Sequence, residues 1–196
     1  MTSTARVLIA DDEPALLDLY TAWLDGTDVD VVRAGCGAEA LSCCDVADVD
    51  VAILDRHMPR VTGDEVLDAI RGAPDCPRVA FVTAATPDVA IVDLAIDAYL
   101  TKPVSREEFV DLVHSLVRRE ALPETVDRYA RKLSKRAALL ETESRSVLRA
   151  DPVYADLEAE LSRLASRIDP TQLDDPYLSR AFADGGRIDA SFGPSP

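Results

Sequence analysis

The sequence predicts an α/β fold, a doubly wound five-stranded parallel sheet followed by a C-terminal α-helical hairpin. Short apolar runs without polar alternation, typical of strands covered on both faces, stand at residues 7–10, 51–54 and 79–82, and shorter strand-like stretches stand at 29–32 and 98–101. Segments of helical periodicity separate these runs, and two amphipathic helical segments follow after residue 122. Strict alternation of strands and helices favours right-handed crossovers within one parallel sheet.

The predicted elements can be placed in order along the chain. The five strands are expected at residues 7–10, 29–32, 51–54, 79–82 and 98–101. The helices between and after them are expected at 14–24, 38–44, 63–70, 87–94 and from 106 onward. Pro14 suits the first turn of its helix and Gly26 ends it, while Ser105 and Glu108 form the pattern of a capping box.

Four of the five strands end in a residue that can bind or react. These residues are Asp11 and Asp12, Asp55, Thr83 and Lys102. The carboxyl ends of parallel strands lie along one edge of the sheet, where open α/β folds bind their ligands, so we expect these residues to converge there. Three carboxylates at one edge would repel one another unless they share a divalent cation, and hard oxygen ligands favour Mg²⁺.

Asp55 is predicted to be the reacting residue. With Mg²⁺ bound, its carboxylate can attack a phosphoryl group in line, while the metal and the Lys102 ammonium neutralise charge on the equatorial oxygens. The Thr83 hydroxyl can donate to one of those oxygens once the group is attached. Taken alone, Asp55 could equally cap a strand or open a turn, and it is the combination of residues that favours phosphoryl chemistry.

Residues 5–120 resemble the receiver domain of a two-component response regulator. The residues that carry this resemblance are Asp11-Asp12, Asp55 with Met58-Pro59 and Gly63, Thr83, Tyr99 and Lys102-Pro103. The resemblance implies that Asp11, Asp12, Asp55 and the backbone carbonyl of His57 hold Mg²⁺. It also implies that Asp55 accepts the phosphoryl group of a sensor histidine kinase and that Thr83 and Lys102 contact that group. Tyr99 would be the switch residue that turns inward when Thr83 moves, and the Lys102–Pro103 bond would be cis.

Two features depart from the usual receiver pattern, and two other families fit the sequence less well. The interval from Thr83 to Lys102 is about one helical turn shorter than is usual in the family, so the helix within it should be short. His57 is either a solvent-exposed side chain or one that tunes the lifetime of the phosphate. A haloacid-dehalogenase-type phosphatase would need an acid at the position of His57, and a flavodoxin would place a phosphate-binding loop where Asp11-Asp12 stand.

The second half of the chain has a different charge balance. Residues 128–149 carry seven basic and two acidic residues. Apolar positions at Val126, Leu133, Leu140 and Val147 repeat every seven residues and predict one long helix. Asp151-Pro152 then has the pattern of a helix start, and a second seam follows at Tyr154, Leu157, Leu161, Leu164 and Ile168. We expect an antiparallel two-helix domain at 124–169, which resembles the HalX domain of haloarchaeal response regulators, and a disordered tail at 170–196.

Composition limits the function classes. The chain has 36 acidic and 21 basic residues, only three of them lysine, and a net charge of -15. This excess argues against general binding to nucleic acids or anionic membranes and fits a halophilic cytoplasm. No apolar run approaches the roughly 18 residues of a membrane span and no signal peptide is evident, so we expect a cytoplasmic protein. The four cysteines lack the spacing of a zinc site and are expected to be reduced.

These features predict a switch and not a metabolic enzyme, since the only reactions expected are its own phosphorylation and dephosphorylation. The expected partner is a sensor histidine kinase. The helical hairpin is expected to form a homodimer, to dock on the receiver or to bind a partner helix, and the face formed by residues 88–101 is the other candidate surface for a homodimer. Two alternative outputs stay open at this stage: a transcription regulator that binds DNA through residues 128–149, and a phosphate sink without a dedicated output.

Overall fold

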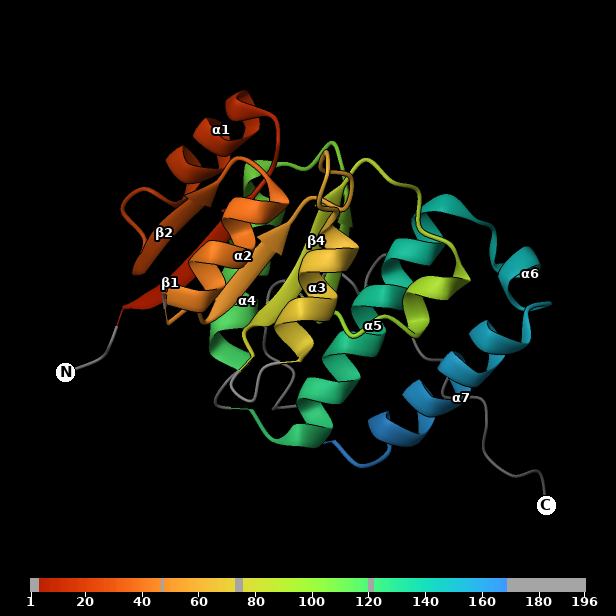
Figure 1. Cartoon of the computed structure of the whole chain (residues 1–196). Coiled ribbons are helices and arrows are strands. Elements are labelled where there is room, and N and C mark those ends of the chain that lie inside the picture. The colour runs from red at the N-terminus through yellow and green to blue at the C-terminus, as the bar shows by residue number, and fades with distance from the viewer. Residues whose placement is uncertain (1–3, 47, 73–75, 120–121, 169–196) are drawn as a thin grey trace, which may run out of the picture. The chain divides into compact units, whose positions relative to one another are not determined.

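The computed structural model describes residues 4–46, 48–72, 76–119 and 122–168 of the chain (Figure 1). The chain divides into two compact units. We call them the sheet unit, residues 1–86 and 93–121, and the helical unit, residues 87–92 and 122–196. The tail at 170–196, which is predicted to be disordered, lies outside the described residues.

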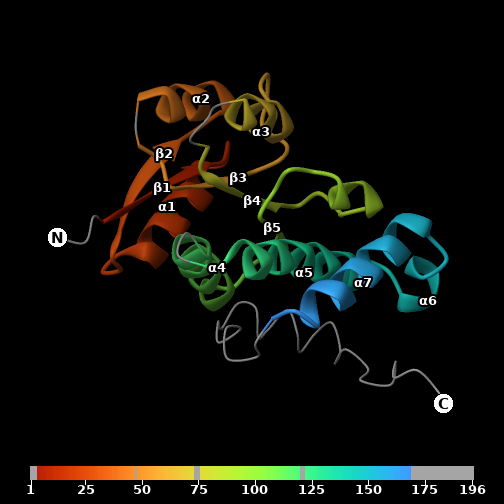
Figure 2. The same cartoon turned by 90° about the horizontal axis from the view of Figure 1, so that it is seen from below.

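The sheet unit confirms the predicted fold class. Five parallel strands lie in the order β2-β1-β3-β4-β5. The strands are β1 (Ala5–Ala10), β2 (Val29–Ala34), β3 (Val51–Leu54), β4 (Arg78–Thr83) and β5 (Ala98–Thr101). The helices are α1 (Pro14–Leu24), α2 (Gly37–Val46), α3 (Gly63–Arg71) and α4 (Arg106–Arg118). Figure 2 shows α2 and α3 on one face of the sheet and α1 and α4 on the other.

The core of the sheet unit explains the uninterrupted apolar runs. Every residue of β3 and residues 7–10 of β1 are almost completely buried, because helices cover both faces of these central strands. On the face of α1 and α4, the rings of Tyr20 and Phe109 stack with their centroids 4.4 Å apart, and Trp23 packs at an angle against both. The predicted capping box of Ser105 and Glu108 is present at the start of α4.

The crossover between β4 and β5 departs most from an ordinary α/β connection. The expected helix over residues 87–94 is reduced to the 3₁₀ helix η1 (Val89–Val92). Ile91 is completely buried, and both long helices of the helical unit pack against η1. The crossover therefore starts and ends in the sheet unit, but its middle belongs to the core of the helical unit.

The helical unit also contains α5 (Glu124–Thr142), α6 (Arg145–Leu148) and α7 (Pro152–Ala165). The prediction of one long helix through Val147 is wrong. The backbone becomes extended at Glu143, and Val147 is 57% exposed, so the fourth position of the apolar repeat contributes nothing to the core. The second seam is confirmed: Asp151 accepts hydrogen bonds from Val153 N–H and Tyr154 N–H, and all five seam residues of this helical stretch are buried.

Acidic residues of α7 form ion pairs with the basic face of α5. Glu160 forms ion pairs with Arg128 and with Lys132, and Glu158 pairs with Arg136 and accepts from the Tyr154 hydroxyl. Partial burial alone would raise the pKa of Glu160, but the pairs with Lys132 and Arg128 lower it. The helices thus pair by charge as well as by apolar contact.

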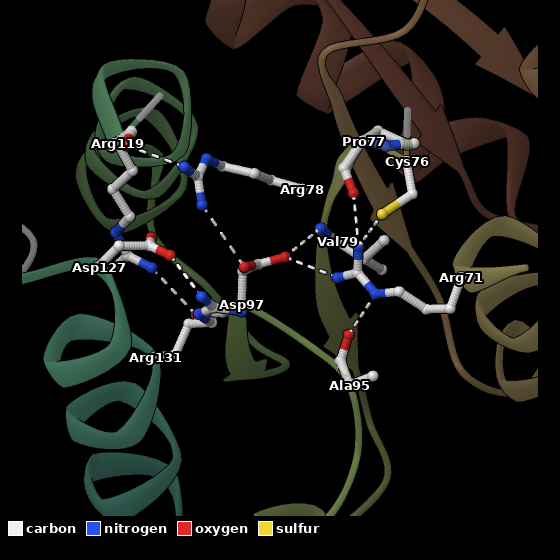
Figure 3. Close-up of polar contacts among 10 residues, drawn as sticks. All are labelled: Arg71, Cys76, Pro77, Arg78, Val79, Ala95, Asp97, Arg119, Asp127 and Arg131. Atoms are coloured by element: carbon white, nitrogen blue, oxygen red, sulfur yellow. Dashed lines mark hydrogen bonds and ion pairs between the residues drawn. The ribbon is translucent and has the colours of Figure 1, made fainter. Parts of the chain in front are cut away.

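A buried ionic cluster, which sequence reasoning missed, lies at the amino ends of β4 and β5 (Figure 3). The Asp97 carboxylate accepts from Arg71 Nη2 at 2.8 Å and from Val79 N–H at 2.7 Å, and Arg78 Nη1 lies 3.7 Å away. Arg119 donates from Nη1 to the Asp97 carbonyl at 3.0 Å. Arg71 also donates to the carbonyls of Ala95 and Pro77, so the side chain and the carbonyl of Asp97 together connect α3, β4, β5 and the end of α4.

The part of the chain that the structure describes contains no helix that is both long and apolar enough to cross a bilayer.

We expect Asp97→Asn to destabilise the sheet unit by about 3 kcal/mol, since removing one partner of a buried ion pair leaves the guanidinium groups uncompensated. Urea unfolding followed by the fluorescence of Trp23, the only tryptophan and a residue of α1, reports on this unit. Asp93→Asn, at an exposed position of the same crossover, is the matched control. An equal effect of both substitutions would contradict a special role of Asp97.

Candidate functional site

Three acidic residues meet at the carboxyl edge of the sheet. The register of β1 and β3 pairs Ala10 with Leu54, and Asp55 N–H donates to the Ala10 carbonyl at 2.8 Å, so Asp11 and Asp55 leave adjacent strands at the same level. One carboxylate oxygen each of Asp11, Asp12 and Asp55 lies within 4.8 Å of the others. Asp11 and Asp55 are buried, whereas Asp12 is exposed. The convergence predicted from the strand ends is therefore present for these three residues.

Lys102 joins the acidic residues from β5. Its ammonium lies 2.7 Å from Asp11 Oδ2 and 3.4 Å from Asp55 Oδ2. Its backbone N–H donates to the Thr83 carbonyl at 2.8 Å, and the peptide bond to Pro103 is cis, as predicted. Burial alone would lower the pKa of Lys102, but the hydrogen bond to Asp11 and the charges of Asp11 and Asp55 raise it. The side chain is a fixed cation between two carboxylates.

The predicted switch residues both contact the backbone of Ala85. Thr83 is completely buried, and its Oγ1 accepts from Ala85 N–H at 3.3 Å. The ring of Tyr99 is also buried, edge-on to Phe81 at 6.2 Å between centroids, and its hydroxyl donates to the Ala85 carbonyl at 2.7 Å. Two side chains from β4 and β5 therefore hold the same short stretch of loop.

Arg56 is a site residue to which sequence reasoning gave no role. Its Nε donates to Asp64 Oδ2 at 2.8 Å, and its guanidinium carbon lies 6.0 Å from the centroid of the Phe81 ring. The hydrogen bond to Asp64 raises the pKa of Arg56. Burial raises the pKa of Tyr99, and nearby Arg56 opposes that rise. The residue after Asp55 thus lies between α3 and the switch tyrosine, and its charge at a position more often apolar was the signal in the sequence.

His57 follows with an exposed side chain, while its backbone N–H points toward Asp55 Oδ1 at 3.4 Å. The exposure agrees with the simpler of the two readings of this side chain. The role of its backbone carbonyl in metal binding stays a prediction.

Gly63 explains why the motif after Asp55 contains a glycine. The first residue of α3 packs directly against the backbone of the Asp55 loop, and Gly63 N–H donates to the Arg56 carbonyl at 2.9 Å. A Cβ at this position would collide with the Asp55 carbonyl oxygen and would lie 2.9 Å from Arg56 Cα. Only a residue without a side chain permits this approach.

The residues at the edge fit a magnesium ion. They offer carboxylate oxygens alone, which hard divalent cations prefer, and no histidine or cysteine that would favour zinc. Lys102 supplies one positive charge to a group that carries up to three negative charges, so a net negative charge remains for a cation to balance. Asp11, Asp12 and Asp55 are the residues that could hold it.

Family models match most of the chain. The response regulator receiver domain matches residues 7–114, and the HalX domain matches residues 118–182. In the structure, the first match covers nearly all of the sheet unit together with η1, and the described part of the second contains α5, α6 and α7.

Individual relatives and solved structures support the same family assignment. A Haloferax volcanii protein provisionally named a transcriptional regulator is 44% identical over 158 residues, which are 79% of this chain and 26% of that protein. Transcriptional regulatory protein CutR of Streptomyces coelicolor is 32% identical over 175 residues, 86% of this chain and 80% of that protein. The receiver domain of the Francisella response regulator 1452 superimposes with a TM-score of 0.56 at 27% identity, covering 59% of this chain and 98% of that domain. The chain thus spans only about a quarter of the Haloferax relative.

We expect Gly63→Ala to weaken Mg²⁺ binding roughly tenfold, because the Asp55 backbone must move away from the new methyl group and a change of about 1.4 kcal/mol is sufficient. Isothermal titration calorimetry in high salt measures the affinity. Gly35→Ala is the control, since its Cβ would meet only the movable Glu39 carboxylate at 3.5 Å. Equal affinities of the two variants would show that the close approach of α3 does not position Asp55.

Proposed function

Because this chain belongs to the two-component response regulators, with a receiver domain followed by a HalX domain, we propose that it accepts a phosphoryl group on Asp55 from a sensor histidine kinase and thereby switches its helical unit. The observation that carries the proposal is the convergence of Asp55, Asp11 and Lys102 at one edge of the sheet. A buried carboxylate beside a fixed cation has little structural use at an open sheet edge, but it is what in-line phosphoryl transfer needs.

In the proposed reaction a carboxylate oxygen of Asp55 attacks phosphorus, and the bond from phosphorus to the kinase imidazole nitrogen breaks. The imidazole leaves as the electron pair returns to nitrogen, and Asp55 becomes an acyl phosphate. A Mg²⁺ ion held by Asp11, Asp12 and Asp55 would neutralise charge on the phosphoryl oxygens. The Lys102 ammonium, already within 3.4 Å of Asp55, is placed to bind one of those oxygens.

Thr83 and Tyr99 supply the response of the protein. A buried hydroxyl that accepts from Ala85 N–H still has its own proton to donate, and a phosphoryl oxygen is the strongest acceptor that this edge would contain. Movement of Thr83 toward that oxygen removes the acceptor of Ala85 N–H and disturbs the loop that also holds the Tyr99 hydroxyl. The switch is therefore a change in the loop after β4.

The output that the structure supports best is contact with protein, either a partner or a second copy of this chain. The basic residues of α5 are already engaged: Arg128, Lys132 and Arg136 pair with α7, and Arg131 pairs with Asp127 within α5. Lys135 donates to a main-chain carbonyl. DNA binding through this helix would first have to break these pairs, although relatives such as CutR are named transcriptional regulators. A phosphate sink would leave the packed helical unit without a role.

Incubation with acetyl phosphate and Mg²⁺ should add one phosphoryl mass to the native chain and none to Asp55→Asn, because the amide lacks the nucleophilic carboxylate. Intact-mass spectrometry with size exclusion in high salt measures both modification and any dimer. Asp18→Asn, a change at an exposed carboxylate on α1, should behave like the native chain. Equal modification of Asp55→Asn and the native chain would assign the chemistry to another residue.

The proposed protein-directed output predicts that Arg128→Gln with Lys132→Gln leaves DNA affinity unchanged. Both side chains pair with Glu160, and the proposed output gives them no DNA phosphate to bind. A gel-shift titration of phosphorylated protein across a range of salt concentrations tests this. A loss of affinity in the double variant, with a smaller salt dependence, would instead support a DNA-binding output through α5.

A further inference from the structure

The crossover segment, residues 87–92, is held inside the helical unit by contacts at both of its ends. Lys135 donates from its ammonium to the Val92 carbonyl at 2.9 Å, and the Thr142 hydroxyl, which lies 3.1 Å from the Leu139 carbonyl of its own helix, also lies 3.5 Å from the Pro87 carbonyl. Between these two points, Ile91 is completely buried and η1 packs against α5 and α7. The segment is therefore a structural part of the helical unit and not a loop that touches it.

The same segment begins immediately after the switch residues. Thr83 accepts from Ala85 N–H, and Tyr99 donates to the Ala85 carbonyl, so both peptide groups of Ala85 are held by side chains of the sheet unit. Pro87, the first residue of the crossover segment, is buried. Thr86 is the only residue between Ala85 and Pro87.

One intervening residue leaves Ala85 and Pro87 little freedom to move independently of each other. Consecutive Cα atoms are about 3.8 Å apart, so Ala85 and Pro87 are separated by at most about 7.6 Å, and the fixed φ of proline removes further freedom. A displacement of Ala85 by a few ångströms cannot be absorbed by one intervening residue. The displacement is instead passed on to the crossover segment and, through the contacts of that segment, to the helical unit.

We propose that the crossover segment is the element through which phosphorylation changes the helical unit, and that Lys135 is the positioning residue that receives the change. The proposal rests on the proposed function, because it requires phosphorylation of Asp55. Signal transfer then runs along the covalent chain from Thr83 and Tyr99 through Ala85 to η1, and from η1 to α5 and α7.

Lys135 is suited to this role by its burial. Lys135 is only 6% exposed, and its ammonium donates to the main chain of the crossover segment. Displacing the Val92 carbonyl would deprive a desolvated charge of one acceptor, which is costly, so α5 is expected to follow the segment. Lys132, one turn earlier on α5, pairs with Glu160 of α7 and does not contact the segment in the described residues, which makes it the matched control.

The test compares amide hydrogen exchange of the full chain before and after reaction with acetyl phosphate and Mg²⁺ in high salt. The native chain, Lys135→Met, Lys135→Arg and Lys132→Met are measured, with phosphoryl uptake read by intact mass in the same samples. In the native chain, phosphorylation should change exchange in peptides covering residues 87–92, 124–142 and 152–165. Lys135→Met should take up the phosphoryl group normally, but the change in hydrogen exchange in peptides of residues 124–165 should be roughly fivefold smaller. Lys135→Arg, which keeps a donor, should restore it, and Lys132→Met should respond as the native chain does.

Each outcome decides the matter. An unchanged response in Lys135→Met, or a phosphorylated native chain whose α5 and α7 do not respond, would overturn the coupling while leaving phosphoryl transfer intact. No phosphoryl uptake in the native chain would overturn the proposed function itself.

A second measurement needs no variant: under increasing denaturant, amides of residues 89–92 should lose protection from exchange together with those of α5 and α7. Loss together with β4 would contradict the inference.

Discussion

The site depends on the parallel ladder that pairs β1 with β3. Its register brings Asp11 and Asp55 to the same level of one sheet edge, where their carboxylates must stay close whatever their mutual repulsion. Lys102 reduces the repulsion, and its place on the edge follows from the hydrogen bond between its backbone and Thr83. Gly63 lets α3 begin directly against the backbone of the Asp55 loop, which fixes the position of that loop. The folded sheet therefore maintains an excess of negative charge at its carboxyl edge, and a bound cation would balance that charge.

The two edges of the sheet are built on opposite principles. At the amino ends of β4 and β5, one buried carboxylate accepts from the Arg71 guanidinium and from the Val79 N–H, with a second guanidinium group 3.7 Å away, so the negative charge there is fully compensated (Figure 3). At the carboxyl ends, negative charge exceeds positive and two hydroxyl groups hold a single loop residue. A compensated carboxylate thus lies at one edge of the sheet and an excess of negative charge at the other, and a response to phosphate is expected at the second.

Most of the sheet unit could be predicted because its signals are local. The apolar runs, the capping box and the residues at the strand ends each follow from short stretches of sequence, and Asp11, Asp12, Asp55 and Lys102 converge as expected. The Asp97 cluster could not be found in this way, since its members come from four elements whose arginines look like surface residues in sequence. The long second-half helix was predicted wrongly because the heptad positions continue to Val147 although the backbone turns at Glu143. Apolar spacing alone does not record where a helix stops.

The interrupted order of the two units has a consequence for modularity. Receiver and output regions are commonly regarded as segments that recombination can join at one point in the linker. Here a single cut near residue 122 would separate α5 and α7 from Pro87–Val92 and would leave a buried isoleucine of the helical unit on the other fragment. A transplanted helical module would meet a foreign crossover in place of its own, so the two regions of this lineage are expected to be inherited together and to exchange partners only when the β4–β5 connection is exchanged with them.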